Sequence, residues 1–228
     1  MKQANENNQA TTTANARTEL VFILDKSGSM RGMEKDTIGG FNAMIDKQKK
    51  QEGEVLITTI LFSNRSVFLH DRLNLQDVKP LEEKDYQVGG STALYDAIGG
   101  AIKHVSTIHK YARPEDLPQH TLFVITTDGM ENASKLFEKD EIKSMIKTQE
   151  ETHRWEFLFL ADNIDAVETA VQIGIEPDHA VDYCVSEDTD LAFMEIDDTI
   201  RHYRQSGAIP KYWSREIKRS NDKRKKRK

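Results

Sequence analysis

Short apolar runs alternate with amphipathic segments along most of the chain. Three of these runs, LVFIL at residues 20–24, LFVIT at 122–126 and WEFLFLA at 155–161, are rich in β-branched or aromatic residues and have few polar positions. A run that is apolar on both faces is typical of a parallel strand covered by helices on both sides. The pattern therefore predicts a parallel sheet that is buried between two layers of helices.

Two further segments extend this predicted sheet. The run Val55–Phe62 is followed after a short polar stretch by residues 66–70, and the pair is predicted to form an antiparallel hairpin that closes near Asn64. Residues 180–185, AVDYCV, are predicted to form a last strand. The hairpin places one antiparallel strand at an edge of the sheet.

Apolar residues recur at helical spacing in five segments between the strands. These segments lie within residues 33–51, 94–108, 142–146, 166–171 and 193–203, and the last helix is expected to end near Gly207. Strands and helices thus alternate in order. The alternation predicts an α/β fold: a doubly wound, three-layer αβα (Rossmann-like) domain with a mostly parallel sheet and one antiparallel edge strand.

The two ends of the chain differ in composition from its centre. Residues 1–17 are polar and contain no apolar run, so we expect a disordered N-terminal tail and no signal peptide. Residues 213–228 are predicted to be a basic C-terminal tail. The predicted domain occupies residues 18–212, which is enough for one hydrophobic core.

Composition limits the environments in which the protein can work. Charged residues make up 31% of the 228 residues, and no apolar run approaches the roughly 20 residues needed to span a membrane. A single cysteine, Cys184, excludes an intrachain disulfide and favours a reducing compartment. We therefore expect a cytoplasmic protein without a membrane span.

Charge is distributed unevenly along the chain. Residues 215–228 carry nine Lys and Arg against two acidic residues, a net charge of +7, which leaves −13 for the rest of a chain whose total is −6. A nucleic-acid-binding domain usually has a basic face, so the acidic body argues against this class. The tail by itself could bind nucleic acid, another polyanion or an anionic lipid surface, or it could be a solvated tail or fold back on the acidic body.

Oxygen-bearing side chains follow the predicted strands at three places. In DKSGS, Asp25, Ser27 and Ser29 follow the first strand, and Asp128 follows the strand at 122–126 in TTDG. Thr92 lies in GGST, just before the helix that starts near residue 94. Ligands of open α/β sheets bind beyond the carboxyl ends of the strands, so these side chains are expected to meet at one end of the sheet.

The chemistry of these five side chains suggests a metal ion. Two carboxylates and three hydroxyls are hard oxygen donors, which suit Mg²⁺, Mn²⁺ or Ca²⁺ and suit Zn²⁺ or Cu poorly. Each segment also has a purely local interpretation, because Asp, Ser and Thr cap helices and Asp-Gly forms ordinary turns. Their joint occurrence at the predicted strand ends favours the metal site.

The same residues resemble the metal-ion-dependent adhesion site (MIDAS) of the von Willebrand factor A (VWA) domain family. That motif has Asp-x-Ser-x-Ser after the first strand, a Thr in a later loop and an Asp after the fourth strand. The sequence matches it at Asp25, Ser27, Ser29, Thr92 and Asp128. The resemblance covers roughly residues 19–207 and is greatest to small, stand-alone bacterial or phage-type members.

The resemblance implies a function as well as a fold. A VWA domain with this motif is not an enzyme; it binds Mg²⁺ or Mn²⁺ and recognises a protein partner whose Glu or Asp completes the coordination of the ion. In such a site, the two serines bind the ion directly, the threonine binds it directly or through water, and the aspartates act mostly through water. Some stand-alone members work beside AAA-type ATPases, and kinship alone suggests such a partner here.

An enzyme is the main alternative. Phosphatases of the haloacid dehalogenase type also have an Asp after the first strand and use Mg²⁺, but they need a second Asp two positions later as general acid and base. That position is Ser27 here. A serine hydrolase would need Gly-x-Ser-x-Gly and a placed His, and none of the seven His falls in the three loops. Both observations favour a binding protein.

Overall fold

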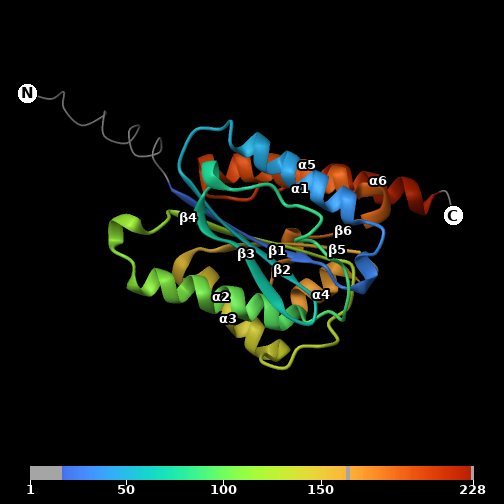
Figure 1. Ribbon diagram of the computed structural model, residues 1–228, viewed down its shortest axis with the longest axis horizontal. Coiled ribbons are helices and arrows are strands. Elements are labelled where there is room, and N and C mark those ends of the chain that lie inside the picture. Colours follow the sequence, from blue (N-terminus) through green and yellow to red (C-terminus); the bar gives the residue numbers. More distant parts are fainter. Residues whose placement is uncertain (1–16, 163–164, 227–228) are drawn as a thin grey trace, which may run out of the picture.

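The computed structural model describes residues 17–162 and 165–226 of the chain. Within these residues, six strands form one sheet, and helices cover both of its faces (Figure 1). The strands are β1 (Thr18–Asp25), β2 (Val55–Phe62), β3 (Ser66–Asn74), β4 (His120–Thr127), β5 (Glu156–Ala161) and β6 (Ala180–Asp182). The α-helices are α1 (Glu34–Gln48), α2 (Leu94–Tyr111), α3 (Lys139–His153), α4 (Ala166–Gln172), α5 (Val185–Ser206) and α6 (Arg215–Lys225).

The strands are arranged in the order β3-β2-β1-β4-β5-β6. Strand β1 lies at the centre and pairs in parallel with β2 on one side and β4 on the other. Strands β5 and β6 continue the parallel part, whereas β3 pairs antiparallel with β2 at the edge. The predicted fold class, a doubly wound sheet with one antiparallel edge strand, is confirmed.

Two hydrophobic layers hold the helices to the sheet. Alternate residues of β1 point to opposite faces, because side chains alternate along a strand. Leu20, Phe22 and Leu24 belong to the layer under α1, α5 and α6, while Val21 and Ile23 belong to the layer under α2, α3 and α4. Figure 1 shows these two groups of helices on opposite sides of the sheet. All five side chains are fully buried, as the apolar run predicted.

The last predicted strand is shorter than residues 180–185. Strand β6 ends at Asp182, and α5 already begins at Val185. Carboxylates cap the start of this helix: the Val185 amide donates to Asp162 Oδ2 over 2.8 Å, and the Cys184 amide donates to Asp188 Oδ2 over 3.3 Å. These two hydrogen-bond acceptors favour the start of a helix at Val185, where the apolar sequence pattern alone predicted a strand.

The basic segment near the C-terminus contains helix α6, which the apolar pattern did not predict. Trp213 is 3% exposed and Ile217 is fully buried, and both belong to the layer under α1 and α5. At the other end, the N-terminal tail predicted for residues 1–17 lies outside the described residues except for Arg17. None of the helices in residues 17–162 and 165–226 is long and apolar enough to span a bilayer.

Candidate metal-binding site

The pairing of the central strands brings the predicted site residues to one end of the sheet. Strands β1 and β4 run parallel in register, with Leu24 beside Thr126. Their carboxyl ends therefore lie side by side, and Asp25 at the end of β1 approaches Asp128 just after β4. A short 3-10 helix, Gly28–Met30, follows β1 and carries Ser29.

Asp25 is the most firmly held of these residues. It is 1% exposed, its Oδ1 accepts a hydrogen bond from the Ser27 amide over 2.7 Å, and its Oδ2 accepts one from Thr127 Oγ1 over 2.5 Å. The hydroxyl of the buried Tyr86 donates to its backbone carbonyl. Because both carboxylate oxygens and the backbone are engaged, Asp25 fixes the turn that carries the two serines.

The serine hydroxyls link the turn at Asp25 to Asp128. Ser27 Oγ and Ser29 Oγ lie 3.0 Å apart within hydrogen-bonding distance, and Ser29 Oγ donates to Asp128 Oδ1 over 2.6 Å. Ser27 is 1% exposed and Asp128 is 4% exposed, whereas Ser29 is less buried. Ser29 is therefore more exposed to solvent than Ser27 and Asp128, the two residues that it contacts.

Thr92 reaches the same place from the loop before α2. A Cβ atom added to Gly129 would lie 3.1 Å from Thr92 Oγ1 and 3.4 Å from Ser29 Oγ. Both hydroxyls thus border the space beside Gly129, and a side chain at residue 129 would fill this space. The structure therefore brings all five predicted residues together: Asp25, Ser27, Ser29, Thr92 and Asp128.

Backbone contacts and one glycine fix the loop that carries Thr92. The Gly28 amide donates to the Gly90 carbonyl, and the Gly89 amide donates to the Lys26 carbonyl, each over 2.9 Å. Gly90 has φ +83°, and a Cβ there would lie only 1.8 Å from Asn64 Oδ1. This position therefore requires glycine both for its backbone conformation and for the close approach of Asn64.

The loop after Asp128 is tied to the start of α2. Glu131 accepts hydrogen bonds from the amides of Tyr95, Ala133 and Ser134, and Asn132 Oδ1 accepts one from the Thr92 amide over 2.9 Å. In return the Asn132 amide donates to the Thr92 carbonyl over 3.0 Å. The segment on the Asp128 side and the Thr92 loop therefore hold each other in place.

Burial raises the pKa of both carboxylates in the cluster. The pKa of Asp25 is raised by burial, although hydrogen bonds from Thr127 and Ser27 oppose the shift. Burial also raises the pKa of Asp128 to about 6, the Ser29 hydrogen bond opposes this, and the negative charge of Asp25 adds to it. The carboxylates of Asp25 and Asp128 are poorly hydrated and repel each other, so a bound cation would stabilise their charged forms.

The donor set fits a hard divalent cation. Within residues 17–162 and 165–226, no three His, Cys, Asp or Glu side chains form a group that could hold a metal ion. The five residues contribute only two carboxylates, and their other three donors are hydroxyls, so the cluster is of a different kind. Small oxygen donors around the space beside Gly129 match the preference of Mg²⁺ or Mn²⁺ for oxygen ligands and exclude a typical zinc site.

Some residues that build the site were not predicted from the sequence. Thr127 and Tyr86 both donate to Asp25, and Asn64 accepts a hydrogen bond from the Ser91 amide over 2.9 Å. Thr127 directly precedes Asp128, so its place at a strand end was readable. Tyr86 and Asn64 lie in separate loops with no motif around them, and only the fold shows their role.

Comparison with known proteins supports the fold and goes no further. No protein-family model and no curated protein matches the chain. Among solved structures, the PilB minor pilin of Streptococcus sanguinis (a D319A mutant) is 12% identical with a TM-score of 0.60, over 86% of this chain and 64% of that one. Proximal thread matrix protein 1 of the mussel byssus is 10% identical with a TM-score of 0.55, over 81% and 46%.

A third structure names the fold. The von Willebrand factor type A protein of Catenulispora acidiphila is 12% identical with a TM-score of 0.52, over 81% of this chain and 42% of that one. The fold is VWA-like. At this identity the likeness concerns the fold alone, and this chain spans less than two thirds of the length of each of the three structures.

Proposed function

We propose that this VWA-like protein binds a divalent cation, Mg²⁺ or Mn²⁺, and uses it to bind an acidic residue of a protein partner. The observation that carries the proposal is the convergence of five oxygen-bearing side chains from three separate loops. Ser29 Oγ lies within hydrogen-bonding distance of both Ser27 Oγ and Asp128, and Thr92 Oγ1 approaches the same space beside Gly129.

Each residue has a distinct role in the proposed site. Ser27, Ser29 and Thr92 would hold the cation through neutral hydroxyl oxygens. Asp25 fixes the turn through the Ser27 amide, Asp128 accepts a hydrogen bond from the Ser29 hydroxyl, and both aspartates supply negative charge. A cation held mainly by neutral ligands remains a strong electrophile and attracts a carboxylate from outside the protein. Ser29 is the exposed part of the network, so the partner's carboxylate would approach from its side.

The proposal is for a binding protein without catalysis. A phosphatase of the haloacid dehalogenase type would need an acid at the position of Ser27, but this residue is only 1% exposed, carries a hydroxyl, and donates its amide to Asp25. A serine hydroxyl at this position cannot replace the carboxylate that exchanges a proton with the substrate in those phosphatases. The arrangement therefore supports ligation and provides no general acid at this position.

Thermal unfolding of chelator-treated protein, titrated with Mg²⁺, Mn²⁺ and Ca²⁺, tests the proposal. A ligand at 100 times its dissociation constant stabilises the folded state by about 2.7 kcal/mol. For a chain of this size, that corresponds to a rise in Tm of roughly 5–10 °C. We expect a saturable rise for the wild type, with Mg²⁺ or Mn²⁺ more effective than Ca²⁺.

Two near-isosteric variants locate the site. Asp128→Asn and Thr92→Val should fold and lose most of the metal-induced rise in Tm, whereas Asp140→Asn, on the exposed surface of α3, should respond like the wild type. The absence of any metal-induced rise in the wild type up to about 10 mM would contradict the proposal, because Mg²⁺ could not then occupy the site at cellular concentrations. An undiminished rise in both variants would place the metal elsewhere.

A further inference from the structure

Helix α6 is fixed to the body by one face. Ile217 is fully buried, and the buried Asp188 of α5 accepts hydrogen bonds from Ser220 Oγ and from Arg224 Nη1, each over 2.7 Å. Asn221 Nδ2 donates to the Asp182 carbonyl over 2.5 Å. These contacts define the orientation of the helix, so its other face has a set position on the molecule.

The other face of α6 is cationic. Its exposed Lys and Arg side chains are Arg215, Lys218, Arg219, Lys223 and Lys225, and the exposed Lys226 follows directly as the C-cap. Glu216 lies 3.3 Å from Arg215 and 2.8 Å from Arg219 and neutralises part of the first turn. In the part of the chain that the structure describes, Lys223, Lys225 and Lys226 form no ion pair with an acidic side chain. Asp222 lies among these lysines and offsets one of their charges, so the exposed face of the helix keeps a net positive charge that includes its C-terminal end.

This end of α6 lies at the same end of the sheet as the proposed metal site. Asn221 contacts Asp182, the last residue of β6, and Arg224 contacts Asp188, which caps α5 where that helix leaves β6. The neighbouring cap of α5 is Asp162, whose amide donates to the Thr127 carbonyl over 3.0 Å, one residue before Asp128. A short series of contacts thus leads from α6 to the site.

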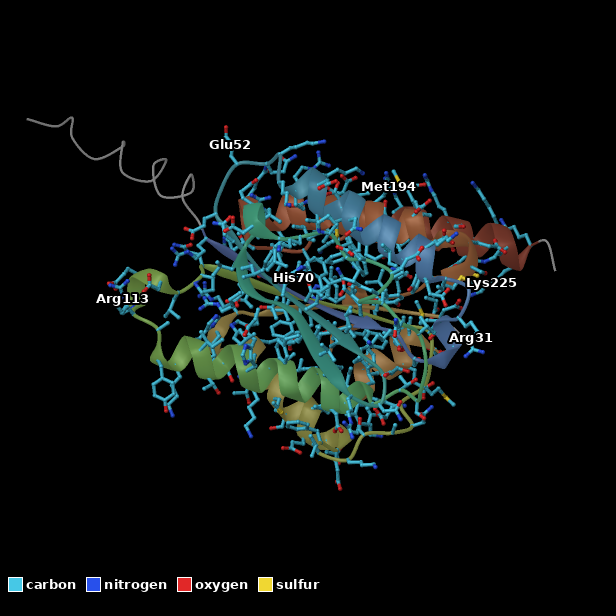
Figure 2. The ribbon with its side chains drawn as sticks, in the orientation of Figure 1. Arg31, Glu52, His70, Arg113, Met194 and Lys225 are labelled. Atoms are coloured by element: carbon cyan, nitrogen blue, oxygen red, sulfur yellow. The ribbon has the colours of Figure 1, made fainter. Side chains whose placement is uncertain are left out.

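The side-chain view shows the same arrangement. Lys225 of α6 and Arg31, two residues after Ser29, project at one end of the long axis of the molecule, and Arg113 projects at the opposite end (Figure 2). Arg31 is exposed. We call Arg31, Lys223, Lys225 and Lys226 the cationic rim. It combines one side chain from the first site loop with three from the end of the last helix.

We propose that the cationic rim is a second contact surface for the partner and that the partner's binding segment is rich in Asp and Glu. One carboxylate of this segment would bind at the metal site, and neighbouring carboxylates would face the rim. The inference rests on the proposed function and adds the chemistry of the partner. Because α6 is fixed to the body, the distance between rim and site is constant, and a segment with correctly spaced acids is selected over a single acid.

Charge on the rest of the molecule favours an acidic peptide over nucleic acid. Outside residues 215–228 the chain carries a net charge of −13, the total of −6 less the +7 of that segment. A nucleic acid presents phosphates along its whole length and would be repelled by the net negative charge of the rest of the molecule. A short acidic segment needs only the rim and the metal site, so it avoids most of that repulsion.

Fluorescence anisotropy with two labelled peptides of equal length tests the inference. One peptide carries a single Glu in a Gly-Ser background, and the other carries a run of Glu and Asp in the same background. Both are titrated with the full chain at low salt, with Mg²⁺ and with EDTA. The proteins are the wild type, the rim variant Lys223→Gln/Lys225→Gln/Lys226→Gln, and the matched variant Lys103→Gln/Lys139→Gln/Lys147→Gln on α2 and α3.

With Mg²⁺, the acid-rich peptide should bind the wild type at least about tenfold more tightly than the single-Glu peptide. The affinity of the rim variant for the acid-rich peptide should fall about tenfold, because each of three exposed charge pairs typically contributes a factor of about two. It should bind the single-Glu peptide unchanged, and the matched variant should bind both peptides like the wild type. EDTA should weaken the binding of both peptides.

Three results would overturn the inference. Equal affinity of the rim variant and the wild type for the acid-rich peptide would show that the rim makes no contact. Binding of the acid-rich peptide that depends on the rim but is unchanged by EDTA would show that the rim binds acids independently of the metal site. The proposed function would not be affected by that result, because the metal-dependent melting tests it separately. A short duplex DNA that binds through the rim more tightly than the acid-rich peptide would make α6 a nucleic-acid contact.

Discussion

Two adjacent glycines of α1 face different surroundings and give a matched test of the packing. A Cβ at Gly39 would meet nothing within 4 Å. A Cβ at Gly40 would lie 2.3 Å from Cδ2 of Phe193 in α5 and 3.0 Å from its Cγ. The same substitution, Gly→Ala, is therefore predicted to have opposite effects at neighbouring positions of one helix.

The magnitudes follow from the two environments. Alanine inside a helix is more favourable than glycine by roughly 0.5–1 kcal/mol, and Gly39→Ala should gain this amount. Gly40→Ala gains the same helical term, but its methyl group is more than about 1 Å too close to the Phe193 ring for ordinary contact. Phe193 is 6% exposed and packs edge-on against Phe41, so it cannot swing into solvent. Overpacking of this kind costs about 1–3 kcal/mol.

Thermal and urea unfolding of both variants measures the difference. At roughly 2–4 °C per kcal/mol, Gly39→Ala should raise Tm by about 2 °C and Gly40→Ala should lower it by several degrees. Phe193→Leu should remove the clash, so that Gly40→Ala is less destabilising in a Phe193→Leu background than in the wild type. Equal stability of Gly39→Ala and Gly40→Ala would refute this packing of α1 on α5.

Three further predictions concern single side chains. Arg204→Met should lower the free energy of unfolding by roughly 1–3 kcal/mol in urea, because the guanidinium donates to the backbone and side-chain oxygens of the buried Gln48, which would lose this donor, and to three carbonyls of the exposed loop that follows; a loss under about 1 kcal/mol would contradict this. Tyr86→Phe should cost about 1–2 kcal/mol in the same assay by removing the donor to the Asp25 carbonyl, and an unchanged urea midpoint would speak against that hydrogen bond. Burial raises the pKa of Glu150 to about 7, so the folded state binds the proton more tightly than the unfolded state and stability falls as pH rises from about 4.5 to 7. Glu150→Gln should therefore stabilise the protein by about 1 kcal/mol at pH 8, since the group is half-exposed, and leave stability unchanged at pH 4 in parallel melts.

The sheet and its order of helices could be predicted because buried parallel strands need apolar side chains on both faces. The runs at 20–24 and 122–126 became β1 and β4 with every apolar side chain buried. Helix α6 could not be predicted in the same way, because a single fully buried residue within it, Ile217, contacts the core. Ion pairing of Arg224 with Asp188 fixes it, and such a contact across 36 residues leaves no local pattern.

The five site residues were predictable because their spacing after strands is a local property of the sequence. The distances between these residues were not predictable, because they depend on the parallel register of β1 and β4 and on how the loops meet at the carboxyl ends of these strands. The hydrogen bond from Ser29 to Asp128 joins residues 99 positions apart. Whether a metal binds there stays a prediction, and the metal-dependent melting tests it.

The contact between α6 and β6 also protects the sheet from other chains. Strand β6 has three residues and lies at the edge of the sheet, where unpaired backbone groups can pair with a strand of another molecule. Asn221 of α6 binds the Asp182 carbonyl at this edge. Removal of α6 would therefore leave a bare edge strand, and the shortened protein should form intermolecular sheet and aggregate at concentrations where the full chain stays monodisperse.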